Sequence, residues 1–587
     1  MTPISLWSLP RGRCLENRTP TILTYAAVSI PWLLFLVAVI GRNVVFETND
    51  DPGYLMIAQG AMYGHRSNQL LFIGRPLGFL LTSLYDIAPS IPWYPFLMLI
   101  SQAFSLSLCF LVVLKQYDYR NSGLATKLIF LGLFGAPLFF SLQFTKASIV
   151  VAGCGAIILL LCPTSTERLF KYSGISLVFL GFFWRPIGGG LAVLLVWILW
   201  TTQLASRRTK VLDILKRSIP LFVLAALSYS IPLAMWNSSA PWLSSETKEY
   251  VKFNSARGQL HGDSYAVSNS AFVGAAKTGL SKNDYELFLN WYFVDREIFT
   301  TARLKSIISG RPVVEDKFEL QSSIRNFFQS NIRPMGTLFC LLVALVTLTI
   351  EKKKLLISLS GGLNLVLGLL VLYFITIFLR MEPRVFFPSL ILITLGGLPW
   401  WPFVSKINSV VASPVVNKHQ SLDVTRIGSI FFRVFFVLLS FNIISKSVES
   451  QFTTRISNKF SETYYKMKFN KPIVAFPDFY SPLLFQPFEQ PPSNQKYQIN
   501  LGTSMQSPDS RKQLENLSLS DQLIKEIVNG KALVACSEPT LSLIQKFAFE
   551  HYRIRVKFKS EPLLSGPYAS VWAVEAKRSN LFNFQSQ

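Results

Sequence analysis

The sequence predicts an all-α polytopic membrane bundle of about eleven transmembrane helices, with extracytoplasmic loops and a small C-terminal α/β domain. Half of the 587 residues are hydrophobic and 15% are charged, whereas soluble domains carry roughly 25% charged residues. The apolar residues lie in runs of about 20, the length that a helix needs to cross roughly 30 Å of hydrocarbon. Charged residues gather at the ends of these runs. Together, these patterns indicate a core that forms in lipid.

The first predicted span covers residues 21–41. Arg11, Arg13 and Arg18 precede it, and positively charged flanks stay on the cytoplasmic side of a membrane. Residues 1–20 are therefore expected to be cytoplasmic. The apolar run is long for the core of a signal peptide and no small-residue cleavage site follows it, so we expect a retained anchor.

Ten further apolar runs continue the bundle. Alternate crossings from a cytoplasmic N-terminus place every Lys/Arg-rich loop inside, as the positive-inside rule requires. The stretch 172–201 is interrupted at Arg185 and forms either one broken helix or two short spans; two spans fit the loop charges better. The shorter run 70–85 contains Arg75 followed by proline, and we expect a juxtamembrane or re-entrant helix outside. The ten spans are expected at 92–114, 125–142, 147–162, 172–184, 187–201, 218–236, 335–350, 355–379, 385–404 and 428–447.

This threading divides the chain into a membrane domain and three outer segments. The membrane domain covers residues 21–447 and carries the outer loops 42–91 and 237–334. The tail, residues 448–587, is expected to be extracytoplasmic. The sequence thus predicts a multi-pass protein, most readily of a bacterial inner membrane, with its two ends on opposite sides.

The tail has the pattern of a small α/β domain. A strand is predicted at 531–536, and Ser537 is a suitable N-cap for a helix that ends near Glu550. Strands near 552–558 and 569–576 follow. No glycine-rich phosphate-binding motif occurs, so nucleotide binding has no support.

The net charge of +24 raises nucleic acid as a partner, but the basic residues are scattered at the ends of apolar runs. Cytoplasmic loops and contact with anionic lipid explain the excess. We therefore expect membrane lipids, and no nucleic acid, as partners. The six cysteines show no metal-ligand spacing, so neither a disulfide framework nor a metal site is predicted.

Two acidic residues, Asp50 and Asp51, follow the first span directly. With Pro52 and Gly53 they predict a turn, which is most often simply solvated. An amphipathic stretch, 54–63, follows and would hold the acids at the membrane surface. A carboxylate there can take a proton from a hydroxyl nucleophile. It can also hold a divalent cation, which we leave open; no cofactor is required by the sequence.

Cations recur at the predicted outer ends of other spans, where the positive-inside tendency disfavours them. Each one alone is more often an interfacial anchor. As a group they offer binding sites for phosphate oxygens, because a guanidinium matches a phosphate group in shape and charge. The candidate set is Lys146, Arg185, Arg380 and Arg384, with Glu382 between the last two.

The outer loop 237–334 is expected to cover this charged face. Ser281 followed by Asp284 predicts the start of a helix, and the aromatic and charged residues at 285–299 predict an amphipathic helix on the membrane-side surface. His65 and His261 could carry protons, although a lone histidine is more often structural.

At these residues the chain resembles the integral-membrane glycosyltransferases of the C-type fold (GT-C). The likeness lies in the acidic pair after the first span, the many spans, the large outer loops and the soluble tail. The stretches 254–263, 279–295 and 380–388 also resemble segments of uncharacterised bacterial proteins near that class. No W-W-D-x-G signature is present, which disfavours transfer to protein asparagine.

The resemblance implies a transferase that moves a sugar from a polyprenyl-phosphate or diphosphate donor to an acceptor on the outer face. Asp50 or Asp51 would be the catalytic base. Lys146, Arg185, Arg380 and Arg384 would contact the phosphate. Two alternatives remain: a lipid or polysaccharide transporter or flippase, for which the break at Arg185 is the favourable feature, and a non-catalytic membrane assembly protein.

Overall fold

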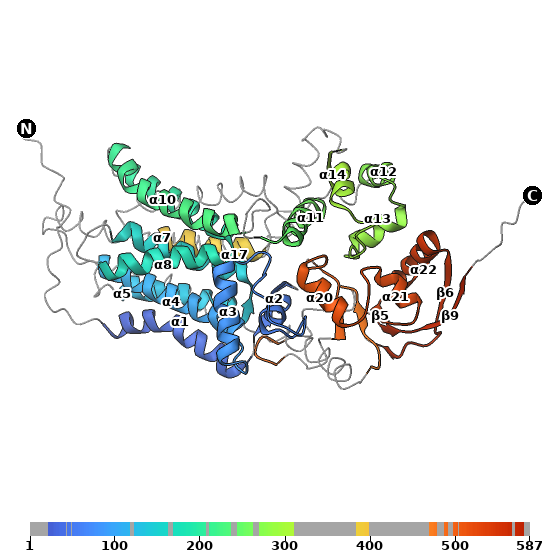
Figure 1. Cartoon of the computed structure of the whole chain (residues 1–587). Coiled ribbons are helices and arrows are strands. Elements are labelled where there is room, and N and C mark those ends of the chain that lie inside the picture. Colours follow the sequence, from blue (N-terminus) through green and yellow to red (C-terminus); the bar gives the residue numbers. More distant parts are fainter. Residues whose placement is uncertain are drawn as a thin grey trace, which may run out of the picture.

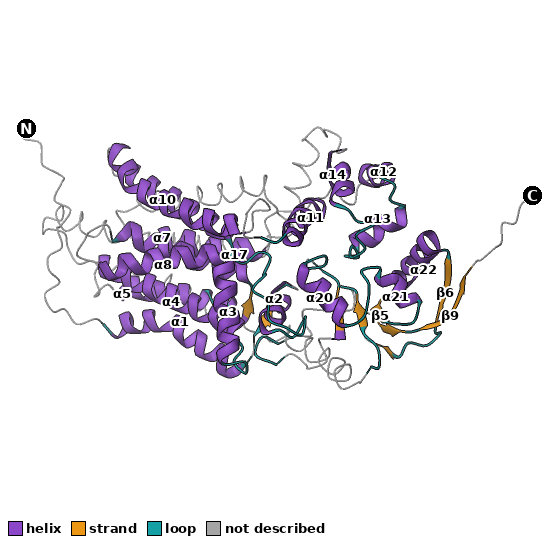
Figure 2. Cartoon of the chain, in the orientation of Figure 1, coloured by secondary structure: helices purple, strands orange, loops and turns teal. Residues whose placement is uncertain are grey.

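A computed structural model describes the positions of the following residues: 21–42, 44–48, 50–117, 122–162, 168–206, 211–235, 243–261, 269–309, 383–397, 469–477, 486–490, 497–502, 504–565 and 570–579. Within these ranges the chain forms a helical bundle at one end and a mixed region of helices and strands at the other (Figures 1 and 2). The predicted spans 335–350, 355–379 and 428–447, together with Arg380 and Glu382, lie outside the described residues.

Three helices of the described chain are long and apolar enough to cross a membrane: α1 (Ile22–Gly41), α4 (Trp93–Tyr117) and α7 (Phe144–Leu161). They confirm the spans predicted at 21–41 and 92–114, and α7 begins slightly before the span predicted at 147–162. The number of about eleven spans is not established by these three helices. The other bundle helices are α5 (Ser122–Phe134), α6 (Pro137–Phe140), α8 (Arg168–Trp184), α9 (Pro186–Ser206), α10 (Val211–Met235) and α17 (Pro383–Gly397).

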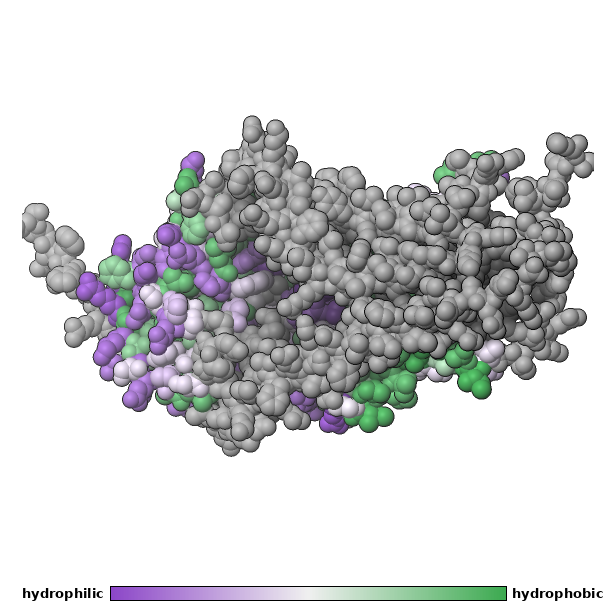
Figure 3. All heavy atoms as spheres, turned by 180° about the vertical axis from the view of Figure 1, so that it is seen from behind, coloured by the Kyte–Doolittle hydropathy of each residue, from purple (hydrophilic) through white to green (hydrophobic). Residues whose placement is uncertain are grey.

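Helix α1 lies at the edge of the bundle and leaves large apolar side chains exposed, including Ile22, Leu33 and Ile40. In Figure 3, hydrophobic side chains line one edge of the bundle, whereas hydrophilic side chains prevail at the opposite end of the molecule. An apolar surface of this kind is stable against lipid, because lipid tails are as apolar as the side chains.

Helix α7 is the centre of the bundle and packs against α4, α8, α9 and α17. Small residues bring α7 and α8 close together. A Cβ atom on Gly181 would lie 2.5 Å from the backbone of Ala152, so this contact requires glycine. Helix α8 then ends at Trp184 and α9 begins at Pro186, which gives two helices over 172–201 with Arg185 at the break.

The range predicted as a single span, 125–142, is helical but interrupted. Helix α5 ends at Phe134 and the short α6 follows, because Gly135 and Pro137 interrupt the helix. The chain then extends as β2 (Ser141–Leu142), which pairs in parallel with β1 (Val45–Phe46). This small ladder joins the first outer loop to the N-terminus of α7.

The turn predicted at Asp50 and Asp51 is also wrong, because both acids lie in the first turn of helix α2 (Asp50–Gln59). Acidic residues and proline are favoured in the first turn of a helix. The expected amphipathic stretch is instead buried on most sides, including Tyr54 through Ala58. The helix expected at 70–85 begins later, at Arg75, and is α3 (Arg75–Ile87).

Outer loop and tail share one hydrophobic core and form a single body, called the outer unit below. The loop contributes α11 (Ser245–His261), α12 (Asn269–Lys277), α13 (Lys282–Leu289) and α14 (Thr301–Ser309). The tail contributes α20 (Pro508–Asn516), α21 (Leu523–Val528) and α22 (Glu538–Tyr552), and the strands β3 (Ile473–Ala475), β4 (Gln498–Asn500), β5 (Leu533–Cys536), β6 (Ile554–Phe558), β7 (Leu564–Ser565), β8 (Ser570–Trp572) and β9 (Val574–Ser579).

The sheet of the outer unit has the strand order β4-β3-β5-β8-β7, in which the first three strands are parallel and the last two are antiparallel to their neighbours. Strands β3 and β5 are apolar and buried along their whole length, as strands covered on both faces are. The predicted strand at 531–536, the helix after Ser537 and the strand at 552–558 are confirmed. The strand expected at 569–576 is divided into β8 and β9, and β9 pairs with β6 instead.

The amphipathic helix predicted at 285–299 is wrong. Helix α13 ends at Leu289, and Trp291 has a φ of 67°, which breaks the helix. Tyr292 and Phe299 enter the core that the loop shares with the tail; the ring of Tyr292 lies 5.5 Å from that of Phe547. The aromatic residues therefore pack against the tail and not against a membrane-side surface. The helix start at Ser281 is confirmed, with a capping box formed by Asp284.

Candidate functional site

Asp51 is fully buried where the N-termini of α2 and α7 meet. Its Oδ1 accepts hydrogen bonds from the Tyr94 hydroxyl (2.9 Å) and from the backbone N–H of Phe144 (3.1 Å), and its Oδ2 accepts one from Thr48 (2.9 Å). Burial raises the pKa of Asp51 to about 7, although these three hydrogen bonds act in the opposite direction. Both oxygens are occupied, so this carboxyl group joins three segments of the chain.

Asp50 is different, although it is the neighbouring residue. Its carboxylate is half-buried and accepts no hydrogen bond from the residues that the structure describes. Burial raises the pKa of Asp50, and the positive charges of Arg384, Arg185 and Arg257 act in the opposite direction. A carboxylate with a raised pKa, close to three cations and without a hydrogen-bond partner among the described residues, can accept a proton from a bound molecule.

Arg185 lies at the break between α8 and α9. Its Nη1 donates a hydrogen bond to the Thr145 hydroxyl (2.5 Å), and its guanidinium lies over the rings of Phe72 (5.6 Å) and Phe144 (5.3 Å). Thr145 and Phe144 open α7, next to the backbone N–H that holds Asp51. These contacts bring Arg185 to the same junction as the acids, as the sequence predicted from placement.

Arg384 lies in the first turn of α17 and is half-buried. Helix α17 packs on α7 and α9, with the ring of Phe387 5.3 Å from that of Phe134. The charge of Arg384 acts on both Asp50 and Arg185. Two guanidinium groups held near each other repel, and an anionic ligand between them would remove that repulsion.

Lys146 has a partner within the protein. Its ammonium group forms an ion pair with Glu47 and donates to the backbone oxygen of Ser141 (3.1 Å), and only 6% of the side chain is exposed. The short β1–β2 ladder places these groups together. Because Glu47 already matches this charge, Lys146 is less suited to bind a phosphate than the arginines are.

Arg257 of α11 is the residue that the sequence did not single out. It is buried, and its Nε (2.9 Å) and Nη2 (2.7 Å) both donate to Oδ1 of Asn254. Its guanidinium lies 5.0 Å from the ring of Trp291. A buried arginine held by an amide and an aromatic ring has a fixed position. The sequence places Asn254 and Arg257 three residues apart, on one helix face, but it does not show that Arg257 is the buried cation of this loop.

Tyr54 adds an unsatisfied donor to the same place. Its side chain is 3% exposed, and its hydroxyl has no hydrogen-bond partner among the described residues. The charges of Asp50 and Arg185 act on this phenol, which places it beside them. Buried hydroxyl groups normally form hydrogen bonds, so one without a partner among the described residues, in a place where the charges of Arg185 and Arg257 act, indicates room for a polar ligand.

The two histidines have structural contacts. The ring of His261 stacks on Trp291 at 4.6 Å, and burial lowers its pKa to about 3, with the charge of Arg257 adding to the effect. It is therefore neutral at physiological pH. Nε2 of His65 lies 3.1 Å from Asp509 of α20, and Ser67 donates to the same carboxylate at 2.5 Å.

Helix α20 connects the outer unit to the bundle side of the molecule. Gln513 donates to the backbone oxygen of Met62 (2.6 Å), and Asp509 receives the contacts of His65 and Ser67 described above. In addition, Arg511 pairs with Glu246 of α11 at 2.6 Å. Thus α20 contacts both the segment that follows α2 and the helix that carries Arg257.

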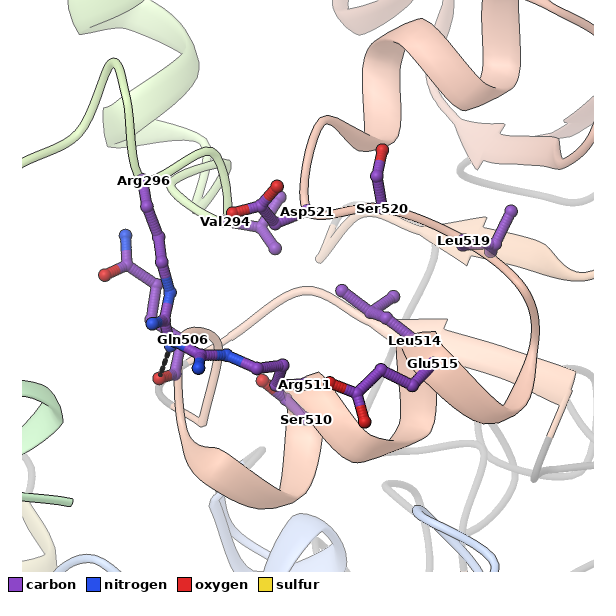
Figure 4. Close-up of a pocket in the computed structure, with 10 residues that line it drawn as sticks. All are labelled: Val294, Arg296, Gln506, Ser510, Arg511, Leu514, Glu515, Leu519, Ser520 and Asp521. Carbon is purple, nitrogen blue, oxygen red and sulfur yellow. Dashed lines mark hydrogen bonds between the residues drawn. The ribbon is translucent and has the colours of Figure 1, made fainter. Parts of the chain in front are cut away.

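A separate cavity of about 290 Å³ lies within the outer unit, between the segment after α13, helix α20 and the turn that follows it (Figure 4). Arg296, Arg511, Glu515 and Asp521 are among the residues that line it, and Arg296 donates to the backbone oxygen of Gln506 at 2.6 Å. None of the residues predicted for the site lines this cavity.

No protein-family model matches the chain, and no curated protein matches it. Among solved structures, the chain is similar to ArnT from Cupriavidus metallidurans, whose crystal structure has undecaprenyl phosphate bound. The two chains are 11% identical and superpose with a TM-score of 0.35, over 94% of this chain and 97% of that one. A TM-score at this level does not establish a shared fold, so the function proposed below rests on the side chains of this protein.

Proposed function

We propose that the protein is an integral-membrane glycosyltransferase of the GT-C kind. It transfers a sugar from a polyprenyl-phosphate or diphosphate donor to an acceptor on the outer face of the membrane. One observation carries this proposal: the charges of Arg185, Arg257 and Arg384 act on the half-buried carboxylate of Asp50, close to the Tyr54 hydroxyl, which has no hydrogen-bond partner among the described residues. A base for the attacking hydroxyl and cations for the leaving phosphate are the groups that promote glycosyl transfer by direct displacement.

The arginines would bind the phosphate of the donor. The carbon–oxygen bond between sugar and phosphate breaks during transfer, and its electron pair leaves on the phosphate oxygen. Guanidinium groups placed before the reaction stabilise that growing negative charge without reorganisation. Arg185 and Arg384 come from the bundle and Arg257 from the outer unit. Arg380 and Glu382 precede Arg384 in the sequence, and we propose that they extend the same site.

Asp50 would act as the base. The acceptor hydroxyl oxygen attacks the anomeric carbon, and its proton passes to the carboxylate of Asp50 as the new bond forms. Direct displacement of this kind inverts the configuration at the anomeric carbon. The pKa of Asp50 is raised by burial, which brings it closer to the working pH and makes the carboxylate a stronger base. Asp51 would hold α2 in place through its three hydrogen bonds and would not take part in proton transfer.

Whether the transfer reaction needs a metal ion is a separate question. We propose that transfer needs no cofactor, because the arginines already supply positive charge. A divalent cation bound by Asp50 is the alternative. Transfer that stops in EDTA and returns with magnesium or manganese would favour the cation.

The experiment uses the purified full chain in proteoliposomes with a panel of labelled polyprenyl-phosphate and polyprenyl-diphosphate sugars. We expect Asp50→Asn to lower transfer by about 100-fold or more, the usual range for a missing general base. Asp86→Asn is the matched control, because Asp86 is an exposed acid on α3 that pairs with Arg66. Full turnover by Asp50→Asn would contradict the assignment.

The same liposomes test the alternative of a transporter. Its favourable feature is that Arg185 lies at a break between two helices. Movement of a labelled lipid across the membrane, without formation of any covalent product, would support a flippase in place of the transferase.

A further inference from the structure

A second group of ionisable side chains lies in the outer unit, where α13 of the loop packs on α22 of the tail (Figure 1). It consists of Asp284, Glu550 and His551. One ligand atom from each residue, a carboxylate oxygen or an imidazole nitrogen, lies within 4.8 Å of the other two. The group is distinct from the site around Asp50 and shares no residue with it.

The two carboxylates are each held through one oxygen. Oδ2 of Asp284 accepts the backbone N–H of Ser281 (2.9 Å), and Oε2 of Glu550 accepts the Ser281 hydroxyl (2.8 Å). Oδ1 of Asp284 faces Nε2 of His551 at 2.6 Å. Hydrogen bonds to the outer oxygen of a ligating carboxylate are the usual support of a metal site, since they fix the orientation of the other oxygen.

A small divalent cation would require modest side-chain movements in both directions, because the three ligand atoms are spread over up to 4.8 Å while one pair is 2.6 Å apart. Atoms that bind zinc at about 2.0–2.2 Å in tetrahedral geometry lie about 3.4 Å from one another. The distance of 2.6 Å between His551 and Asp284 would therefore need to open by less than about 1 Å. One imidazole and two carboxylates suit zinc, and hard cations such as calcium or magnesium prefer oxygen ligands alone.

Asn283 provides an independent observation. Its side chain is 6% exposed, and its Nδ2 donates to the backbone oxygen of Leu543 (3.2 Å) and to Glu550 (3.4 Å). Its Oδ1 is buried and accepts no hydrogen bond from the described residues. A buried acceptor without a donor is costly, and a water molecule bound to a metal ion is a strong donor.

Asp284 is buried, whereas Glu550 and His551 reach solvent, so an ion has a path of entry.

We propose that Asp284, Glu550 and His551 bind one zinc ion, with water as the remaining ligand. The ion joins α13 to α22 and thereby fixes the outer loop to the tail. This site is structural and does not depend on the proposed transferase activity.

The test uses the full chain in detergent, first stripped with EDTA and then equilibrated with buffered zinc. We expect about one zinc ion per chain by elemental analysis after gel filtration, and an increase in the melting temperature of about 5 °C, as expected for a ligand that binds only the folded state. Cobalt in place of zinc should give the visible absorption of a four-coordinate site.

Two variants and a control decide the outcome. Glu550→Gln and His551→Ala should each weaken zinc binding by about 10-fold or more and remove the thermal shift. His65→Ala is the control, because His65 also pairs with an aspartate but has no third ligand in the described chain. Glu550 is exposed, so its variant should keep the fold, which the melting temperature in EDTA verifies.

Equal zinc content in the wild type and in both variants would overturn the proposal, and so would the absence of bound zinc in the wild type. In either case His551 and Asp284 form an ion pair only.

Discussion

The charges at the junction of α2 and α7 fall into two regions. In the first, which we call the paired region, Lys146 is matched by Glu47, and Asp51 is satisfied by three hydrogen bonds. In the second, the open region, the positive charges of Arg185, Arg257 and Arg384 act on the single carboxylate of Asp50. Neighbouring residues, Asp50 and Asp51, belong to different regions.

The difference between the two regions suggests that one stabilises the structure and the other binds a ligand. Burying a charge without a partner is unfavourable, and the paired region meets this cost within the protein. The open region has more positive than negative charge among its described residues, so an anionic ligand would complete it. We infer that the paired region fixes the geometry and that the open region binds substrate.

The strongest way to break this comparison is to remove a cation from the open region. Arg185→Gln should lower kcat/KM for the donor by about 100-fold, because a charge that stabilises the leaving phosphate is lost. Arg66→Gln is the matched control, since Arg66 pairs with Asp86 at the surface. If both variants have equal activity, Arg185 does not contact the donor.

A change in the paired region should act on stability instead. Lys146→Met leaves Glu47 unpaired in a partly buried position, and we expect a loss of about 2 kcal/mol in the free energy of unfolding. Activity per folded molecule should change little. The double variant Glu47→Gln/Lys146→Met should recover most of the lost stability, and failure of this rescue would show that Lys146 acts through something other than its ion pair.

Asp51 gives a pH-dependent test of the same region. Its pKa is about 7 in the folded protein and 3.8 in the ordinary case, so the folded state holds a proton that the unfolded state releases between about pH 4 and 7. Stability from this group is present below about pH 4 and is lost as the pH rises to about 7, by about 1.4 kcal/mol per pH unit.

Asp51→Asn should remove this dependence, whereas Asp86→Asn should keep it. Melting temperatures between about pH 4 and 8 measure the effect. An unchanged slope in Asp51→Asn would mean that Asp51 is ionised throughout this range.

The smallest expected effect is a shift in the pH dependence of activity, which tests Asp50 as the base. Arg384 lowers the pKa of Asp50, so Arg384→Gln should raise that pKa further. Because the base must be ionised to accept a proton, the acidic limb of the pH profile of kcat/KM should move to higher pH, by about half a unit. Lys557→Gln, an exposed lysine paired with Glu575, should leave the profile unchanged. A shift toward lower pH would contradict Asp50 as the base.

Local patterns in the sequence predicted the elements that depend on local forces. Two predicted apolar runs correspond to α1 and α4 in the structure. The helix start predicted at Ser537 is that of α22, and the one predicted at Ser281 has a capping box with Asp284. One error arose where a distant segment decides the conformation. The aromatic residues after Leu289 partly follow a helical pattern. They nevertheless leave the helix, because their side chains pack in the core that the loop shares with the tail. Asp50, Asp51, Pro52 and Gly53 were interpreted as a turn because the same residue types are also common in the first turn of a helix, where the structure places them.

Several members of the candidate site were also within reach of the sequence. Asp50, Arg185 and Arg384 were expected together because each lies at a predicted outer end of an apolar run, and the structure brings them close. Their roles remain predictions. The sequence could not separate Asp50 from Asp51, because adjacent acids have the same local signals and only their partners differ. Arg257 was missed because its loop carries several cations, and the one that is buried cannot be recognised without the fold.

By itself, the sequence determined the helical membrane bundle, the location of its charged groups at helix ends and the small sheet of the tail. These features follow from hydrophobic periodicity, span length and capping, which act over a few residues or one helix. Only the tertiary structure shows that the loop and the tail share one hydrophobic core and that Lys146 forms an ion pair with Glu47. It also shows that the charge of Arg257 affects the pKa of Asp50. Such pairings join residues far apart in the chain, and their energies depend on burial and distance, which no local pattern encodes.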